Sequence, residues 1–169
     1  MKTLSSLLQA GVLLAAVSCT AWAQDSKIGY INTQLITSTS APAKAAQAKL
    51  EQEFSKRQKE LSDQQNALKG LSEKFERDAP TLTELQRASR QREFAEQSRD
   101  FQRKQREFQE DLNSRRNEEL QQVLDKANKA VKQVAESEKY DFVIQEVVFT
   151  NGKNDITEKV LKILNTPSK

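Results

Sequence analysis

The feature that most constrains this chain is a run of strong helix formers from Pro42 to Glu136, more than half of its 169 residues. Gln, Glu, Lys, Arg, Ala and Leu dominate the run, and these residues lose little conformational freedom in a helix. One break interrupts it at Pro80, because proline cannot donate to the helical ladder and disfavours helix at Ala79. The following Thr81-Leu82-Thr83-Glu84 has the pattern of a capping box, which marks a new helix start. The sequence therefore predicts two long helices folded back on each other, with a tip near residues 78–82.

The apolar residues of both arms are spaced as in a coiled coil. In the first arm they recur three, four or seven apart: Leu50, Phe54, Leu61, Leu68, Leu71 and Phe75. In the second arm Leu82 and Leu85 precede three phenylalanines spaced by seven: Phe94, Phe101 and Phe108. After Phe108 the spacing shifts to four, and a wider apolar face runs from Leu120 to Val134. Because Arg57 and Gln64 dilute the seam of the first arm, we expect a loosely packed hairpin.

The two arms differ in length, and this difference predicts the architecture. At about 1.5 Å per residue the first arm spans roughly 55 Å and the second roughly 80 Å. The first arm can therefore cover the second only as far as Glu119, so Leu120 to Val134 must pack on something else. We predict a mainly α protein, in which a long antiparallel hairpin (42–119) projects from a small β-containing body (24–41 and 120–169).

The first 23 residues have the pattern of a secretory signal peptide. Lys2 precedes an apolar run from Leu7 to Val17, and Ala21-Trp22-Ala23 matches a cleavage site. Two alternatives are a retained membrane anchor and a lipoprotein cleavage box ending at Cys19. Cleavage before Gln24 would lower the formal charge from +3 to +2 by removing Lys2, and would leave no Cys. This near balance of charge, together with export, argues against a nucleic-acid partner.

The expected body is small. Residues 27–32 read as a strand, 33–41 as a Ser/Thr-rich connection, and Ser40 as the cap of the first long helix. Residues 140–150 form one long strand or, as we favour, two short ones, followed by a turn at 151–154. Asp155 is expected to cap a last helix with Ile156, Val160, Ile163 and Leu164 on its apolar face.

A body of this size buries too little apolar surface to be stable alone, and a small sheet exposes its edges. We therefore predict self-association, with strands from several copies sharing one sheet or barrel. The residues expected to form this oligomerisation body are Ile28, Tyr30, Ile31, Phe142, Val143, Ile144, Val147, Val148 and Phe149.

The residue types exclude most catalytic chemistry. The chain has no His, its one Cys lies in the predicted signal peptide, and its four glycines form no phosphate-binding loop. Nucleophile pairs with His are therefore absent, and no spacing suggests metal ligands. We predict no enzyme activity, no catalytic residue, no metal and no cofactor.

Two groups of arm residues are candidate binding residues. Basic residues gather around the tip: Lys69, Lys74, Arg77, Arg87, Arg90 and Arg92. They read either as ordinary helix-surface charge or as a surface that attracts acidic chains or anionic lipid headgroups. Phe94 and Phe101 read either as seam residues or as partly open rings that contact unfolded chains.

The chain resembles the Skp (OmpH-like) family of periplasmic chaperones. The resemblance covers the whole predicted mature chain and is most specific at its ends: Ile28-Gly29-Tyr30-Ile31-Asn32, Tyr140-Asp141-Phe142-Val143-Ile144-Gln145 and Asn154-Asp155-Ile156-Thr157. It implies a homotrimer whose strands form a small β-barrel and whose hairpins enclose a cavity. It further implies an ATP-independent holdase for unfolded outer-membrane proteins, with lipopolysaccharide or anionic lipid as a further partner.

Two other functions stay open on the residues alone. One is a structural coiled-coil spacer or scaffold of the cell envelope, which would not keep an unfolded client soluble. The other is a histone-like DNA binder, which would require steeply salt-dependent duplex binding.

Overall fold

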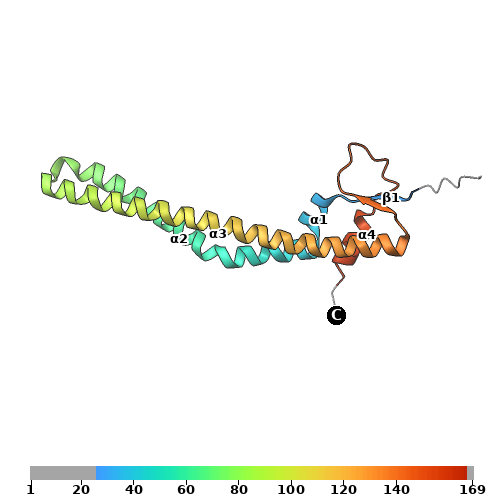
Figure 1. Ribbon diagram of the computed structural model, residues 1–169. Helices are drawn as coiled ribbons and strands as arrows, with labels where there is room; N and C mark the ends of the chain where they lie inside the picture. Colours follow the sequence, from blue (N-terminus) through green and yellow to red (C-terminus); the bar gives the residue numbers. More distant parts are fainter. Residues whose placement is uncertain (1–25, 167–169) are drawn as a thin grey trace, which may run out of the picture.

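The computed structural model describes residues 26–166, so the predicted signal peptide lies outside the described residues. A long helical hairpin projects from a small body at one end (Figure 1). Its arms are α2 (Ala41–Asp78) and α3 (Glu84–Glu138), joined by the short 3-10 turn η1 (Ala79–Thr81). The predicted fold class is therefore confirmed: a mainly α chain with a small β body.

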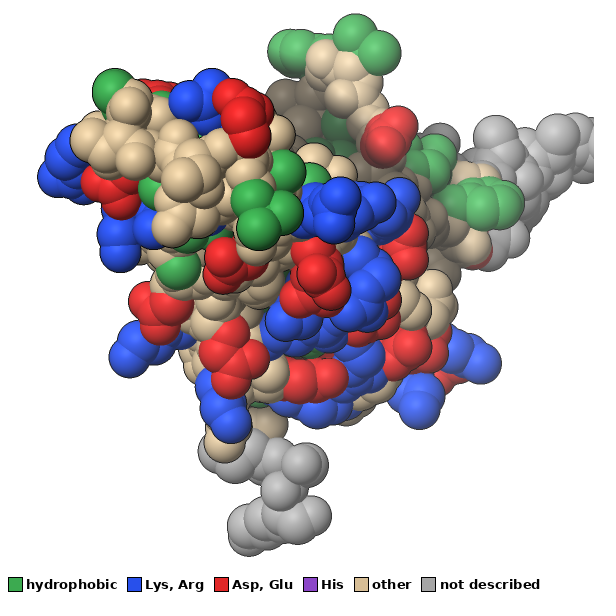
Figure 2. Space-filling view, turned by 90° about the vertical axis from the view of Figure 1, so that its left-hand side faces the viewer, with side chains coloured by type: hydrophobic (Ala, Val, Ile, Leu, Met, Phe, Trp, Pro, Cys, Tyr) green, Lys and Arg blue, Asp and Glu red, His purple; other side chains and the backbone are tan. Residues whose placement is uncertain are grey.

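The surface of the rod is polar. Viewed along the rod from its tip, Lys and Arg side chains are interspersed with Asp and Glu (Figure 2). Nine of the ion pairs among residues 26–166 lie within one arm at i, i+4 spacing or i, i+3 spacing, among them Lys56–Glu60 and Arg103–Glu107. Such pairs support an exposed helix by a few tenths of a kcal/mol each, roughly 0.2–0.5.

The tip differs from the prediction in its capping residues. The box is formed by Thr83 and Gln86 rather than by Thr81 and Glu84: the Thr83 hydroxyl accepts from the Gln86 N–H, and the Gln86 side chain accepts from the Thr83 N–H. The reason is that η1 continues past Pro80 to Thr81, whose hydroxyl donates to the Asp78 carbonyl. The chain becomes extended only at Leu82 and Thr83, so Thr83 is the first residue able to cap.

Residues 33–41 are not the plain connection that we predicted. Most of them form a short helix, α1 (Thr33–Thr39), capped by the Asn32 side chain, which accepts from the Leu35 N–H at 2.9 Å. Its Ser and Thr hydroxyls donate to carbonyls one turn earlier, so these side chains find their hydrogen-bond partners within the helix. Ile36 is fully buried beneath it and Ser40 caps α2 as predicted.

The sheet has two short parallel strands, β1 (Ile28–Tyr30) and β2 (Phe142–Ile144). The second strand that we favoured within 140–150 is absent from the described residues. The other side of β1 is occupied by residues 154–156, since the Tyr30 N–H donates to Asn154 and the Ile156 N–H donates to Tyr30. Residues 147–149 form no strand, and Val148 and Phe149 are exposed.

The core lies where the lower part of α3 meets α1, β1 and α4 (Thr157–Leu164). Asp155, which we predicted to cap α4, is not its N-cap: Ile156 holds that position and makes no side-chain cap hydrogen bond, while Asp155, one residue earlier, accepts from the Thr157 N–H at 2.8 Å. The fully or nearly buried residues of this core are Ile31, Ile36, Ala127, Ala130, Val134, Ile156, Val160 and Leu161. The wide apolar face of the second arm therefore packs on the body, although Leu120 at its upper end is exposed.

Candidate functional site

The base of the hairpin is the most tightly connected part of the rod. Phe54 of α2 and Phe108 of α3 meet edge to face with their ring centroids 5.7 Å apart, and both are less than 10% exposed. The Arg57 guanidinium lies 5.7 Å from the Phe108 ring and pairs with Asp111 at 2.5 Å. The polar residue Arg57, which we expected to loosen the seam, therefore covers an aromatic ring and joins the arms.

Below this aromatic pair, four charged residues join α2 to α3; we name them the clamp: Lys49, Glu53, Arg115 and Glu119. Glu119 is 5% exposed, and its carboxylate accepts from the Lys49 ammonium at 2.5 Å and from the Arg115 guanidinium at 3.0 Å. Arg115 also reaches Glu53 across the seam at 3.2 Å. The Lys49 hydrogen bond lowers the pKa of Glu119, and Arg115 adds to this against the opposing effect of burial. A buried carboxylate is therefore kept charged by partners from both arms.

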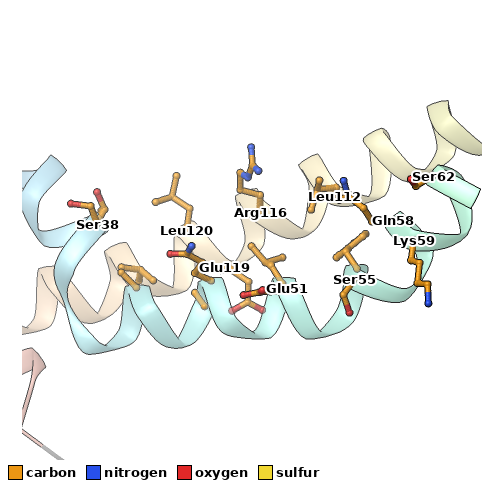
Figure 3. A pocket seen from close by; sticks show the side chains of 17 residues that line it. Ser38, Glu51, Ser55, Gln58, Lys59, Ser62, Leu112, Arg116, Glu119 and Leu120 are labelled. Carbon is orange, nitrogen blue, oxygen red and sulfur yellow. The ribbon is translucent and has the colours of Figure 1, made fainter. Parts of the chain in front are cut away.

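A groove of about 970 Å³ lies beside the clamp, along the face shared by α1, α2 and α3. Its apolar lining comes from both arms and includes Leu50, Phe54, Leu112, Leu120 and Val123. Figure 3 shows Leu112 and Leu120 on α3 above Glu51 and Ser55 on α2, with Arg116 between the two leucines. The groove is open to the outside and combines these apolar side chains with polar ones such as Gln47, Ser55 and Gln58.

Charged side chains border this groove. Lys59 and Arg116 line it and form no ion pair within residues 26–166. The negative charge of Glu119, in contrast, is balanced by Lys49 and Arg115. Glu51 also lines the groove and is likewise without an ion-pair partner among the described residues. An extended chain lying here would meet apolar side chains flanked by two cations and one anion.

The outer part of the hairpin is less tightly packed than its base. Phe94 and Phe101 are half-buried, as are Leu61 and Leu68 opposite them in the seam. Leu85, which we placed in the seam, is 83% exposed, because the helix begins only one residue before it and the first arm does not cover it. Gln64 meets Asp100 across the seam at 3.4 Å, a weak contact.

The predicted basic residues at the tip divide into two groups. Arg90 pairs with Asp78 at 3.2 Å and Arg87 donates to the Ala79 carbonyl at 3.0 Å, so both hold the turn together. Lys69 lies 4.0 Å from Glu73 on its own helix. Lys74, Arg77 and Arg92 are exposed and make no ion pair in the part of the chain that the structure describes.

The predicted oligomerisation residues also divide in two. Ile31 belongs to the core, and Tyr30, Val143 and Val147 are half-buried. The others expose apolar side chains around the small sheet: Ile28, Phe142, Ile144, Val148 and Phe149. A further pocket of about 250 Å³ separates β1 from the loop after β2.

Sequence reasoning did not identify the clamp or the groove. Spacing marked Leu50 and Phe54 as seam residues and placed Leu120 on the wider apolar face, but it did not show which of these side chains stay open to the outside. The clamp is only weakly indicated by the sequence. Each of its basic residues faces an acidic residue of the other arm: Lys49 faces Glu119, and Arg115 faces Glu53. Recognising this requires the register of the two arms, which propensity does not give.

The described residues contain no group of acidic, His or Cys side chains suited to hold a metal, and none of their helices has the length and apolarity needed to cross a membrane. An open groove on a polar helical rod, above a body with exposed apolar strands, defines a binding protein of the helical-hairpin class.

The comparisons agree with this class. A family model described as outer membrane protein (OmpH-like) matches residues 27–164. The chain is 33% identical to the chaperone protein Skp of Pectobacterium atrosepticum over 154 residues, covering 90% of this chain and 92% of the relative. It is 34% identical to the chaperone protein Skp of Photorhabdus luminescens over 165 residues, covering 96% and 98%.

A solved structure shares the fold. A crystal structure of an OmpH-like outer membrane chaperone from Caulobacter crescentus superposes with a TM-score of 0.69, at 19% identity, over 83% of this chain and 84% of that one. The chain belongs to the OmpH-like outer membrane protein family. It is a chaperone, as the resemblance implied, and family membership confirms the prediction that it is not an enzyme.

Proposed function

We propose that the protein is an ATP-independent periplasmic holdase that binds unfolded outer-membrane proteins and prevents their aggregation before membrane insertion. Family membership supports the chaperone class, and the groove at the hairpin base is the observation that carries the binding mode. An unfolded β-barrel chain exposes apolar residues that would otherwise associate with one another. A long surface with modest apolar patches binds such a chain through many weak contacts, which leaves release possible without nucleotide.

The hairpin and the body would have different roles. Residues 42–119 would form the client-holding arm, and 24–41 with 120–169 the oligomerisation body, after removal of a signal peptide at 1–23. Self-association is supported by the exposed apolar side chains around the sheet, such as Phe142, Val148 and Phe149. We propose a homotrimer, in which these residues pair between copies and three hairpins border one cavity. Sedimentation that gives a monomer mass at all concentrations would contradict it.

The aggregation assay tests the holdase role directly. An unfolded outer-membrane β-barrel protein is diluted from denaturant, and its light scattering is followed with and without the mature protein. We expect suppression of scattering at stoichiometric chaperone and no dependence on ATP. A structural spacer would leave the scattering unchanged.

A groove variant locates the contact. Leu120 is 43% exposed in the groove, so Leu120→Gln adds a polar group there without emptying a core. Leu85→Gln is the matched control, because Leu85 is 83% exposed at the other end of the same helix. We expect weaker suppression for the groove variant only. Equal suppression of scattering by both variants, with equal helix content by circular dichroism, would show that the client binds elsewhere on the protein.

The tip offers a second, weaker contact. We propose that Lys74, Arg77 and Arg92 attract acidic client segments or the phosphates of lipopolysaccharide or anionic lipid, while Lys69, Arg87 and Arg90 contribute less because each has a partner within its own chain. Phe94 and Phe101 would add apolar contact where their rings are open. Replacing Lys74, Arg77 and Arg92 by Gln should reduce binding to anionic vesicles at low salt, and little at high salt.

A further inference from the structure

The loop between β2 and α4 contains an Asn-Gly pair that the proposed function does not use. Asn151 and Gly152 are both exposed, and Gly152 has a φ of 78°, a left-handed conformation that glycine adopts without strain. Among the asparagines of residues 26–166, Asn151 is the only one followed by a glycine. Because Gly152 has no Cβ, its backbone nitrogen is open to approach by the side chain of the residue before it. A nucleophile and an electrophile therefore lie next to each other in an exposed loop.

The hydrogen bonds of this loop leave the two reacting groups available. The Gly152 N–H donates to the Thr150 hydroxyl at 3.1 Å rather than to a backbone carbonyl. A hydroxyl both accepts and donates, so it can pass this proton to water. The Asn151 Oδ1 accepts from the Lys153 N–H at 3.0 Å, and this donor stabilises the negative charge that develops on Oδ1 when the adjoining carbon is attacked. The loop therefore favours ring closure between Asn151 and Gly152.

The other asparagines of the described chain lack this arrangement. Asn32 and Asn165 are bonded as caps at the starts of α1 and α2. Asn154 lies in the same loop, but the residue after it has a side chain and donates its N–H to the Gly152 carbonyl at 3.3 Å. The remaining four lie inside α2 or α3, where the following N–H is bonded to a carbonyl one turn earlier: Asn66, Asn113, Asn117 and Asn128.

We propose that Asn151 is a site of spontaneous deamidation, and that its conversion weakens the edge of β1. In the first step the Gly152 nitrogen forms a bond to Asn151 Cγ and the Cγ–Nδ2 bond breaks. The amino group leaves as ammonia and takes up the proton lost from the Gly152 nitrogen, which leaves a cyclic succinimide. Water then adds to one of the two succinimide carbonyls and opens the ring. Attack on the side-chain carbonyl gives aspartate, and attack on the main-chain carbonyl gives isoaspartate.

The two products differ in their effect on the backbone. Both add a negative charge to the loop, but isoaspartate also inserts an extra carbon atom into the main chain. Just beyond this point, the Tyr30 N–H donates to the Asn154 carbonyl at 2.8 Å and the Ile156 N–H donates to the Tyr30 carbonyl at 2.9 Å. These bonds hold residues 154–156 against β1, and a lengthened loop misplaces their partners. Isoaspartate is therefore the product that loosens the body.

Peptide mass spectrometry of the incubated mature protein tests the modification. Trypsin separates Asn151 from Asn154, because it cleaves after Lys153. Each peptide is followed for the mass gained when the side-chain NH2 is replaced by OH, and an enzyme that methylates isoaspartate identifies that product. We expect Asn151 to convert at least about tenfold faster than Asn154 and Asn66, since only Asn151 precedes an unhindered nitrogen.

The rate should also rise from pH 5 to pH 8, because the attacking nitrogen must lose its proton. Conversion of Asn151 no faster than that of Asn154 would overturn the proposal. Asn151→Ser is the control variant: it removes the reactive amide and keeps a small polar residue that is common in turns. A mass gain in the same tryptic peptide of this variant would place the modification at another residue and would also overturn the proposal.

Hydrogen exchange tests the effect on β1. In incubated protein that contains isoaspartate, we expect the amides of Tyr30 and Ile156 to exchange about tenfold faster than in fresh protein. Fresh Asn151→Asp, which has the added charge on an ordinary backbone, should exchange as the wild type does. Incubated Asn151→Ser should not change. Unchanged exchange at Tyr30 and Ile156 in the isoaspartate form, or an equal rise in the Asn151→Ser variant, would overturn the effect on β1.

A consequence for assembly rests on the proposed homotrimer. The exposed side chains of Val148 and Phe149 come shortly before the modified residue, in the segment proposed to pair between copies. We therefore expect incubated wild type to dissociate at an at least about threefold higher protein concentration than incubated Asn151→Ser, measured by sedimentation. A monomer at all concentrations would contradict the homotrimer, whereas the mass and exchange measurements decide the modification without it.

Discussion

The body and the hairpin of this chain are stabilised by different means. The body packs branched aliphatic residues of four elements into a core where Ile36, Ile156 and Val160 have no exposed surface. The hairpin has two buried residues in the whole 38-residue first arm, Ala43 and Phe54. It therefore depends on helix propensity, capping and ionic contacts distributed along its length. A holdase benefits from this division, because a compact body keeps the arms in place while the arms remain open to a client.

The largest change in the free energy of unfolding is expected from a cavity in the body core. Ile156→Ala removes a fully buried side chain that contacts the core next to Gly29, and we expect a loss of about 3–4 kcal/mol in the free energy of unfolding. Urea unfolding followed by circular dichroism measures it. A loss below about 1 kcal/mol would mean that the body core contributes no more than an exposed arm.

The next effect is expected at the hairpin base. Phe108→Ala empties one half of the aromatic pair, and we expect a loss of about 3 kcal/mol, whereas Phe101→Ala, one heptad outward and half-buried, should cost less than half as much. Proteolysis or hydrogen exchange at the arms measures both. Equal costs would contradict the difference between the base and the outer part of the hairpin.

A smaller effect is expected at the tip. Thr83→Ala removes the N-cap of α3, which should cost about 1 kcal/mol of local helix stability. Thr81→Ala leaves the cap in place, because the Thr81 hydroxyl only donates to the Asp78 carbonyl. Faster hydrogen exchange over 84–88 in the first variant alone would confirm the position of the capping box. Faster exchange in the Thr81→Ala variant alone would instead place the capping box at Thr81 to Glu84, as the sequence suggested.

The smallest effect is that of acid on the exposed ion pairs of the hairpin. Lys104 and Arg103 lower the pKa of Asp100 to about 2, so its ionised form stabilises the folded chain. A depressed folded-state pKa gives stability that is fully present above the ordinary value of roughly 4 and is lost as the pH falls toward 2. Glu119 and Glu138, whose pKa values are also lowered, should act in the same direction, the latter through Lys159 of α4.

The measurement is the thermal midpoint of the wild type and of Asp100→Asn at pH 7 and pH 3. We expect the difference between the two proteins to shrink at pH 3, and only by a small amount, because exposed pairs are screened by solvent and salt. A difference that grows on acidification would have the wrong sign for a carboxylate stabilised in the folded state.

The hairpin was predictable from local properties of the chain. Helix propensity over 95 residues, one proline and a seven-residue spacing of phenylalanines leave few alternatives, since each is a local property that acts before any tertiary contact forms. The terminal helix and the cap at Ser40 were predictable for the same reason. The unequal arm lengths also showed that the lower part of the second arm must pack on the body.

The remaining features depend on contacts between residues that are far apart in the chain. Residues 33–39 form a helix whose Ile36 is buried in the core, and residues 154–156 rather than a second strand from 140–150 occupy the other side of β1. The clamp and the groove depend on the register of two arms whose paired residues lie some 54 to 70 positions apart. Such contacts are set by how surfaces fit after the chain has folded back, and no local pattern of residues encodes them.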